Sequence, residues 1–280
     1  MPDAIYIAAR RGLLDTLDAG VDQLDAIVLV GAQAVYLHTG DADLAVDPYT
    51  ADADLALDPR ELHAQPRLEE LMADAGFTAA PSEVGRWAKA VEHEGQKYNV
   101  IVDLMVPEAL AGGGRRSARI PPHAERSARR ARGLEAALID RERRTISSMS
   151  ADDPRTFEIQ VAGPSALLVA KLVKISERQD NPGRLIDKDA LDVVRLLRAI
   201  PTEKLAQSLE RLRRDALSAE VTAAAIEALR DLFGSPVGSG SAMAARAAAP
   251  LEREVTLAAS AAALANDLLN SLGSVRGIRG

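Results

Sequence analysis

The sequence predicts an α+β protein in which a small mixed-sheet core precedes a helical C-terminal region. Short runs of branched apolar residues alternate with helical stretches near the beginning of the chain, and helical patterns dominate from residue 161 onward. This order favours a sheet domain followed by packed helices. We expect a core over 1–110, an Arg-rich insert with a returning strand over 111–160, and a helical domain over 161–280.

The first part of the expected core alternates helices and strands. Branched apolar residues at AIVLV indicate a buried strand, and the glycines that follow the helical stretches indicate where those helices end. The expected elements are a helix over roughly 10–18, a strand over 26–30, a helix over 32–40, a strand over 51–57 and a helix over 66–75.

The later elements are expected to complete the sheet and then to form helices. RWAKAVEHE and YNVIVDLMV predict a hairpin around Gly95, whereas the Gly/Pro/Arg-rich stretch after it predicts a loop with an irregular helix. EIQVA predicts a further strand, followed by a helix that starts near Pro164 and a second helix in the block that ends at Ile200. The rest is expected to be helical with a break at GSPVGSGS.

Composition narrows the chemistry. The 280 residues include no cysteine, which excludes disulfides, thiolate metal sites and cysteine nucleophiles. The four histidines have no metal-ligand spacing, so a metal held by carboxylates is favoured over zinc. No apolar run approaches the roughly 20 residues of a membrane helix, and no secretory signal is evident, so we expect no membrane partner and a cytoplasmic location.

Charge is unevenly distributed along the chain. The formal net charge is −7, yet residues 115–144 contain ten arginines and only four acidic residues. Such a segment is suited to a polyanion such as RNA, although a solvated loop explains it equally simply.

Two carboxylates stand out in the stretch TADADLALD. Asp52 and Asp54 are two residues apart in a predicted strand, so their side chains should point the same way. Asp is disfavoured in strands, and a pair at this spacing suits one or two hard cations. The alternative is an exposed strand face that happens to carry Asp.

Two further positions extend this pattern. Gly31 lies between a strand and a helix, where a missing side chain lets a phosphate approach backbone N–H groups. Asp103 lies among apolar residues in VIVDLMV, where a carboxylate needs a cation to offset its desolvation. That cation is either a metal ion or a nearby arginine. Three carboxylates on neighbouring strands would form an oxygen-rich site for Mg²⁺.

Four segments together resemble the DNA polymerase β-like nucleotidyltransferase superfamily, and more narrowly the AbiEii-type nucleotidyltransferase toxins of toxin–antitoxin systems. They are VGAQAVYLHTG, YTADADLAL, VDLMV and KLVKISERQDNPGRLIDKDALDVVRLL. The resemblance covers about residues 24–200 and implies a polymerase β-like core. It implies transfer of a nucleoside monophosphate from an NTP, with Mg²⁺ or Mn²⁺, to RNA such as the 3′ end of tRNA, and an antitoxin partner.

The resemblance also assigns roles to individual residues. It implies that the metal ligands are Asp52, Asp54 and Asp103, and that catalysis is supported by Lys171, Lys188 and Asp189. It implies that the nucleotide is bound by Gly31, Ala32, Thr50, Lys174 and Arg178. The spacing of the basic residues from 171 to 178 fits an ordinary solvated helix face as well.

Several alternatives remain open at this point. Family members usually carry Gly or Ser where this chain has Ala32, and often an Arg where it has Pro48. These departures allow a nucleotide-binding module without turnover. The negative net charge would also suit nucleotidylation of a cationic small molecule such as an aminoglycoside, and a protein side chain is a further acceptor.

Overall fold

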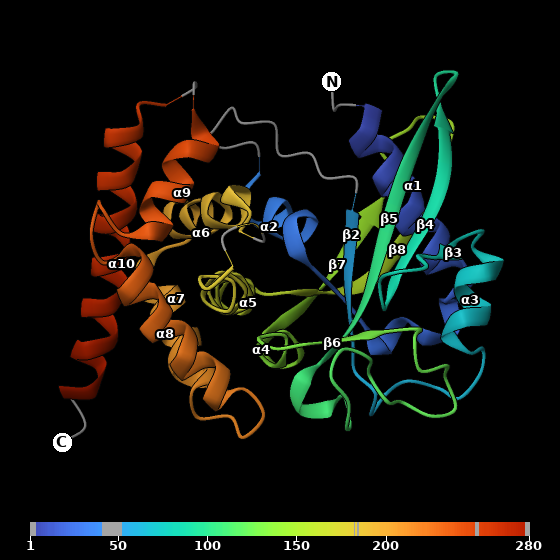
Figure 1. Ribbon diagram of the computed structural model, residues 1–280, viewed down its shortest axis with the longest axis horizontal. Coiled ribbons are helices and arrows are strands. Elements are labelled where there is room, and N and C mark those ends of the chain that lie inside the picture. The colour runs from blue at the N-terminus through green and yellow to red at the C-terminus, as the bar shows by residue number, and fades with distance from the viewer. Residues whose placement is uncertain (1–3, 41–51, 182, 184, 250–251, 278–280) are drawn as a thin grey trace. The chain divides into compact units, whose positions relative to one another are not determined.

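The chain divides into two compact units in a computed structural model that describes residues 4–40, 52–181, 183, 185–249 and 252–277 (Figure 1). The sheet unit comprises residues 1–34, 49–134 and 141–162, and the helical unit comprises residues 35–48, 135–140 and 163–280. The three-part division expected from the sequence stays a prediction.

The sheet unit is organised around one mixed eight-stranded sheet. Its strands are β1 (Ile27–Val30), β2 (Asp52–Leu57), β3 (Thr78–Ala79), β4 (Arg86–His93), β5 (Gln96–Pro107), β6 (Arg129–Ala131), β7 (Arg141–Ser147) and β8 (Thr156–Ala162). Seven of them follow the order β3-β4-β5-β2-β1-β8-β7, and β6 pairs with β5 beside that path. Strand β2 is central, antiparallel to β1 and parallel to β5.

Helices cover one face of this sheet. Helix α1 (Ala4–Ala19) packs on β5 and β4, and a Cβ on its Gly12 would lie 2.9 Å from a methyl of Val100. Val100, Val102 and Leu104 of β5 are buried, so the side chains between them, including Asp103, point to the opposite face. The unit also contains α3 (Leu68–Asp74) and the 3₁₀ turns η1 (Val21–Ala26) and η2 (Glu108–Leu110).

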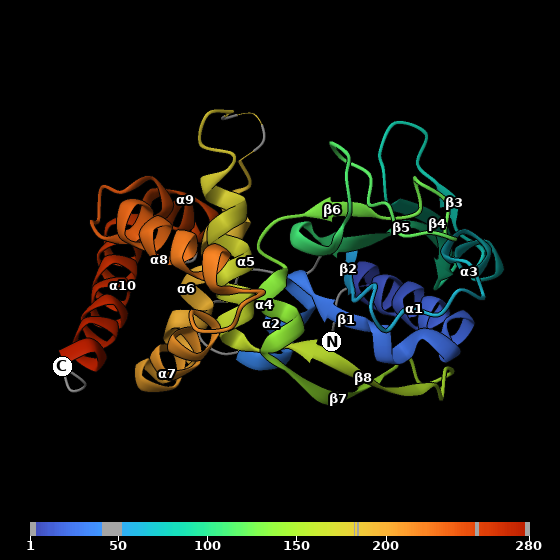
Figure 2. The ribbon, with the colours of Figure 1, turned by 90° about the horizontal axis from the view of Figure 1, so that it is seen from below.

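The helical unit packs around helix α5 (Pro164–Ser176). Most residues of this helix are apolar, and most of its side chains are buried. Its other helices are α4 (Glu135–Ile139), α6 (Asp187–Ala199), α7 (Thr202–Leu212), α8 (Ala219–Phe233), α9 (Ser239–Ala248) and α10 (Glu254–Gly277). Helix α10 contacts α9, α7 and α8 (Figure 2). Helix α2 (Gly31–Thr39) begins in the sheet unit and continues into this one.

The predicted α+β class with C-terminal helices is confirmed. The Gly/Pro/Arg-rich stretch 111–133, every residue of which the structure describes, is mostly loop as expected, but it contains the short strand β6 in place of the expected irregular helix. The sequence pattern did not reveal strand β7, which is at the edge of the sheet. Ile146 is its only buried residue, so the strand lacks the alternation of apolar and polar side chains that identifies a half-buried strand. Helix α1 is also longer than the predicted 10–18.

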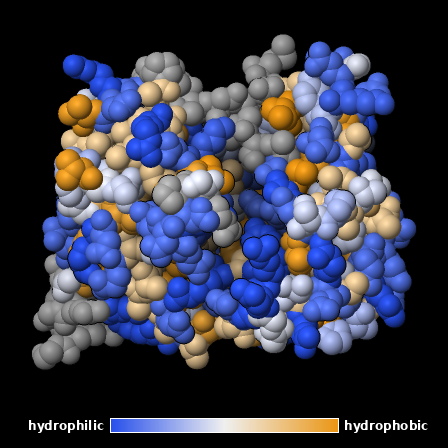
Figure 3. All heavy atoms as spheres, viewed as in Figure 1, coloured by the Kyte–Doolittle hydropathy of each residue, from blue (hydrophilic) through white to orange (hydrophobic). Residues whose placement is uncertain are grey.

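The surface of the described residues carries few exposed large apolar side chains. Val21, Met149, Ile186, Val237 and Val255 are scattered along the chain. Apolar residues form only small separate groups on the face shown in Figure 3. No helix in the described part of the chain is long and apolar enough to cross a membrane.

Candidate active site

The predicted carboxylates come together on the sheet face opposite α1. Asp54 of β2 is the register partner of Asp103 of β5, and Asp52 is two residues before Asp54 on the same face. Parallel pairing therefore places the three side chains on one small area, as the strand pattern predicted. The register, which no local sequence pattern contains, makes Asp54 and Asp103 direct neighbours.

Residue 31 must be glycine because it lies directly against the side chain of Asp54. It starts α2 with a φ of +69°, and a Cβ at this position would lie 2.0 Å from an Asp54 carboxylate oxygen. A side chain at residue 31 would therefore collide with Asp54 as well as strain the backbone. The predicted phosphate-binding turn and the predicted metal ligand are thus adjacent in space.

Asp103 has an unusual environment for a carboxylate. Its side chain is 13% exposed, and its Oδ1 is buried without a hydrogen-bond partner among the described residues. Burial and the negative charge of Asp54 raise the pKa of Asp103 to about 6, against the opposing effect of Arg129 and Arg86. The group is thus short of positive charge even with two arginines nearby.

Two arginines flank the carboxylates. An Arg86 nitrogen lies 3.5 Å from Asp52 Oδ2, and an Arg129 nitrogen lies 3.6 Å from Asp103 Oδ2. The sequence pattern did not single out either residue, because the first lies at the start of β4 and the second in the Arg-rich segment. The arginine alternative for Asp103 is therefore present.

Gln33, in the first turn of α2, has a positioning role that the sequence pattern did not indicate. Its side chain is buried, and Nε2 donates a hydrogen bond to the backbone carbonyl of Asp52 at 3.2 Å. Its Oε1 accepts a hydrogen bond from Arg10 of α1 at 3.3 Å. Gln33 thus ties the start of β2 to the first turn of α2 and to α1.

The donor set fits a divalent cation. Carboxylate oxygens are the ligands that Mg²⁺ and Mn²⁺ prefer, and the unpartnered Asp103 Oδ1 is an acceptor that lacks a positive partner. Over the described ranges, no three acidic or histidine side chains already stand close enough together to enclose a metal ion. A ligand set of three carboxylates would therefore require these side chains to move closer together.

A second cluster lies within the helical unit. Lys171 Nζ of α5 is 2.7 Å from carboxylate oxygens of both Asp189 and Asp192 of α6, and its side chain is 9% exposed. The neighbouring carboxylates raise the pKa of Lys171, and the two lysines hold the pKa of Asp189 well below its usual range. Arg195 extends the network, 3.2 Å from Asp192. This arrangement joins α5 to α6.

The remaining predicted residues of that unit differ in exposure. Lys174 lies 2.8 Å from Asp189 Oδ2 and is 37% exposed, whereas Lys188 is exposed at the start of α6. Arg178 is half-buried in the turn after α5. The catalytic role of Lys188 and the nucleotide-binding roles of Lys174 and Arg178 stay predictions.

Two positions complete the comparison with the predicted site. Thr50 lies outside the described residues. Ala32 is half-buried in the first turn of α2, next to Gly31.

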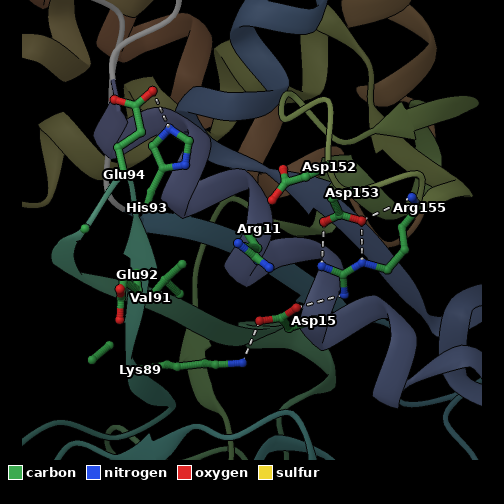
Figure 4. A pocket seen from close by; sticks show the side chains of 12 residues that line it. Arg11, Asp15, Lys89, Val91, Glu92, His93, Glu94, Asp152, Asp153 and Arg155 are labelled. Carbon is green, nitrogen blue, oxygen red and sulfur yellow. Dashed lines mark hydrogen bonds and ion pairs between the residues drawn. The ribbon is translucent and has the colours of Figure 1, made fainter.

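A separate pocket of about 750 Å³ lies on the opposite face of the sheet (Figure 4). Arg11 and Asp15 of α1, Lys89 of β4 and Arg155 are among its lining residues. Lys89 pairs with Val100 and shares its face, so the pocket is on the α1 side, away from Asp103. Asp15 pairs with both Lys89 and Arg155, so these three charged groups of the pocket are already engaged with one another.

Carboxylates on one sheet face beside a glycine that begins a helix are features compatible with chemistry on phosphates. The sequence profile of the nucleotidyltransferase family matches residues 16–218, and the chain therefore belongs to this family. Comparisons with curated proteins and with solved structures found no significant match to this chain. The matched range includes both clusters, and family membership supports nucleoside monophosphate transfer in general.

Proposed function

We propose that this protein is a metal-dependent nucleotidyltransferase that transfers a nucleoside monophosphate from an NTP to RNA, specifically to the 3′ end of tRNA. The observation that carries the proposal is the in-register pair Asp54 and Asp103, with Gly31 against Asp54 and an unpartnered Asp103 oxygen. We further propose that it acts as the toxin of a toxin–antitoxin pair, which rests on the sequence resemblance.

The chemistry follows from these residues. The acceptor hydroxyl oxygen forms a bond to the α-phosphorus, the bond between that phosphorus and the bridging oxygen to the β-phosphate breaks, and pyrophosphate leaves. A divalent cation bound by the carboxylates would supply charge stabilisation to the phosphates. Asp103 orients the attacking hydroxyl and accepts its proton, which suits a carboxylate whose pKa is raised to about 6. The turn at Gly31 offers backbone N–H groups to the triphosphate.

An RNA acceptor is supported by the Arg-rich segment. Arg115, Arg116 and Arg119 are exposed in the stretch that pairs with β6 through the Ser117–Arg129 bridge. Arg129 in turn contacts Asp103. This segment thus offers positive charge next to the carboxylates, where a polyanionic acceptor would approach.

The net charge of −7 favours a second candidate, transfer to a cationic small molecule. The two acceptors differ in their response to salt. Binding to RNA through several arginines should weaken steeply as salt rises, whereas a small cation should lose much less.

The test is incubation of the protein with Mg²⁺, each α-labelled NTP in turn, and total tRNA. Asp52→Asn and Asp54→Asn should each lower labelling at least about a hundredfold, because each removes a charge from the cation site. Asp74→Asn is a matched control, since Asp74 is exposed at the end of α3 and away from the carboxylates.

The outcomes separate the candidates. Label in tRNA that depends on Asp52 and Asp54 supports the proposal and identifies the nucleotide. Pyrophosphate release without labelled RNA would exclude RNA as acceptor and favour a small molecule or protein. Nucleotide binding without pyrophosphate release would contradict the enzyme and favour a binding module.

A further inference from the structure

We propose that Arg86 and Arg129 are exchangeable counter-ions, which neutralise the carboxylates before the cation binds and then bind the phosphates of the incoming nucleotide. This inference rests on the proposed function. It assigns two arginines that neither the family match nor the sequence pattern identifies.

The strand arrangement brings both arginines to the same side of Asp103. Strands β4 and β6 both pair with β5, and Arg86 is the register partner of Asp103. The two strands meet at Gly85, which has a φ of +70° and whose Cβ would lie 2.4 Å from the Arg129 backbone nitrogen. This close approach is what places Arg86 and Arg129 beside the same carboxylates.

The ion pairs between these two arginines and the carboxylates are weak. The Arg86–Asp52 and Arg129–Asp103 separations of 3.5 and 3.6 Å are longer than a good charged hydrogen bond. Each arginine is about one-third exposed, so its ion pair with these carboxylates contributes little and is easily broken, and Arg86 is held instead by its 2.8 Å hydrogen bond to Glu83. By contrast, the buried Lys171 contacts in the helical unit are 2.7 Å long.

Charge explains why an exchange is favourable. The three carboxylates share two arginines, one of which is also paired with Glu83 at 2.8 Å, and the buried Asp103 Oδ1 has no hydrogen-bond partner in the described residues. A divalent cation would supply the missing charge and compete with the arginines for the same oxygens. The displaced guanidinium groups, which suit phosphate oxygens, would then lie where the triphosphate enters.

The experiment measures Mn²⁺ affinity by calorimetry without nucleotide, for the full chain and for Arg86→Gln, Arg129→Gln and the double variant. Each single variant should bind Mn²⁺ up to about fivefold more tightly, because a competing exposed ion pair is removed. Arg126→Gln is the matched control, since Arg126 is in the same segment and bonds to the carbonyl of Pro81. Arg86→Lys and Arg129→Lys keep the charge and should stay near the wild-type affinity.

The second measurement is the binding of inorganic tripolyphosphate in the presence of Mn²⁺. The glutamine variants should bind it several-fold more weakly than the wild type and the Arg126→Gln control, although they bind Mn²⁺ more tightly. A merely structural role would lower both affinities together.

The results distinguish failure of the proposed metal site from failure of the proposed arginine exchange. If Mn²⁺ affinity depends on Asp52 but is unchanged or weakened in the glutamine variants, the exchange is refuted while the metal site stands. If Asp52→Asn leaves Mn²⁺ affinity unchanged, the metal site itself fails, and the exchange fails with it. Unchanged tripolyphosphate binding would likewise refute the second role of the arginines.

Discussion

The contact between Gly31 and Asp54 yields the sharpest prediction, a loss of activity in Gly31→Ala that exceeds its loss of stability. A Cβ at residue 31 would lie 2.0 Å from Asp54 Oδ2, whereas ordinary contact begins at 3.4 Å. The Asp54 carboxylate oxygen would therefore have to withdraw by about 1.4 Å, and Asp54 Cγ and Cβ, at 2.7 and 2.8 Å, would have to move with it. A misplacement of about 1 Å in a positioned group can cost roughly a hundredfold in rate.

The stability cost has a separate origin and is smaller. At a φ of +69°, alanine is less favourable than glycine by about 1–2 kcal/mol. A loss of that size would lower the melting temperature by roughly 2–8 °C. Gly31→Ala should therefore remain folded at 25 °C while its transfer rate falls about a hundredfold.

Gly95→Ala provides the matched control. Gly95 has a similar φ of +76°, and a Cβ there would meet nothing within 4 Å. It should show the same backbone cost without the collision. The assay is kcat/KM for labelled nucleotide transfer, with melting temperatures measured in parallel. Equal activities for the two variants would refute the argument that the Gly31 contact holds Asp54 in place.

Three further predictions concern stability. Because burial raises the pKa of Asp103 to about 6 in the folded state, Asp103→Asn should stabilise the protein by roughly 2–3 kcal/mol at pH 8, and this gain should vanish below about pH 4, as urea unfolding across pH would show. Lys171→Met should cost about 1.5–3 kcal/mol in urea unfolding, because it removes the buried cation between Asp189 and Asp192 and leaves them only Lys174 and Arg195, whereas the exposed Lys188→Met should stay within about 0.5 kcal/mol. Gln33→Ala should cost about 1–3 kcal/mol and also lower kcat/KM, because it releases the backbone of Asp52; unchanged activity would contradict the positioning role.

The carboxylates were predictable because their signal is local. Asp52 and Asp54 differ by the two-residue period of a strand, so their shared face can be derived without any partner strand. Asp103 stood out because a charge within VIVDLMV conflicts with its apolar neighbours. The strand and helix pattern around them was sufficient to predict the fold class.

The counter-ions were not predictable in this way. Arg86 and Arg129 reach the carboxylates only through the pairing of β4 and β6 with β5, and that register depends on contacts between distant segments. Gln33 likewise acts through its contact with the Asp52 backbone across 19 positions of sequence. The basic residues of α5 and α6 illustrate the reverse problem, since helix spacing alone could not show that Lys171 is buried between two carboxylates while Lys188 is exposed.

The raised pKa of Asp103 and the weak arginine pairs are two consequences of one electrostatic arrangement. Asp54 opposes ionisation of Asp103, and two arginines at 3.5 and 3.6 Å from the carboxylates do not fully compensate. Any added positive charge at this place would lower the pKa of Asp103 and increase the fraction of this carboxyl that is ionised near neutral pH, which is the form that can accept the proton of a hydroxyl. The same charge would attract a triphosphate to a site that is otherwise net negative. The site would thus be ready for catalysis only when a cation is bound, which couples cation binding to both substrate capture and ionisation of the proposed base.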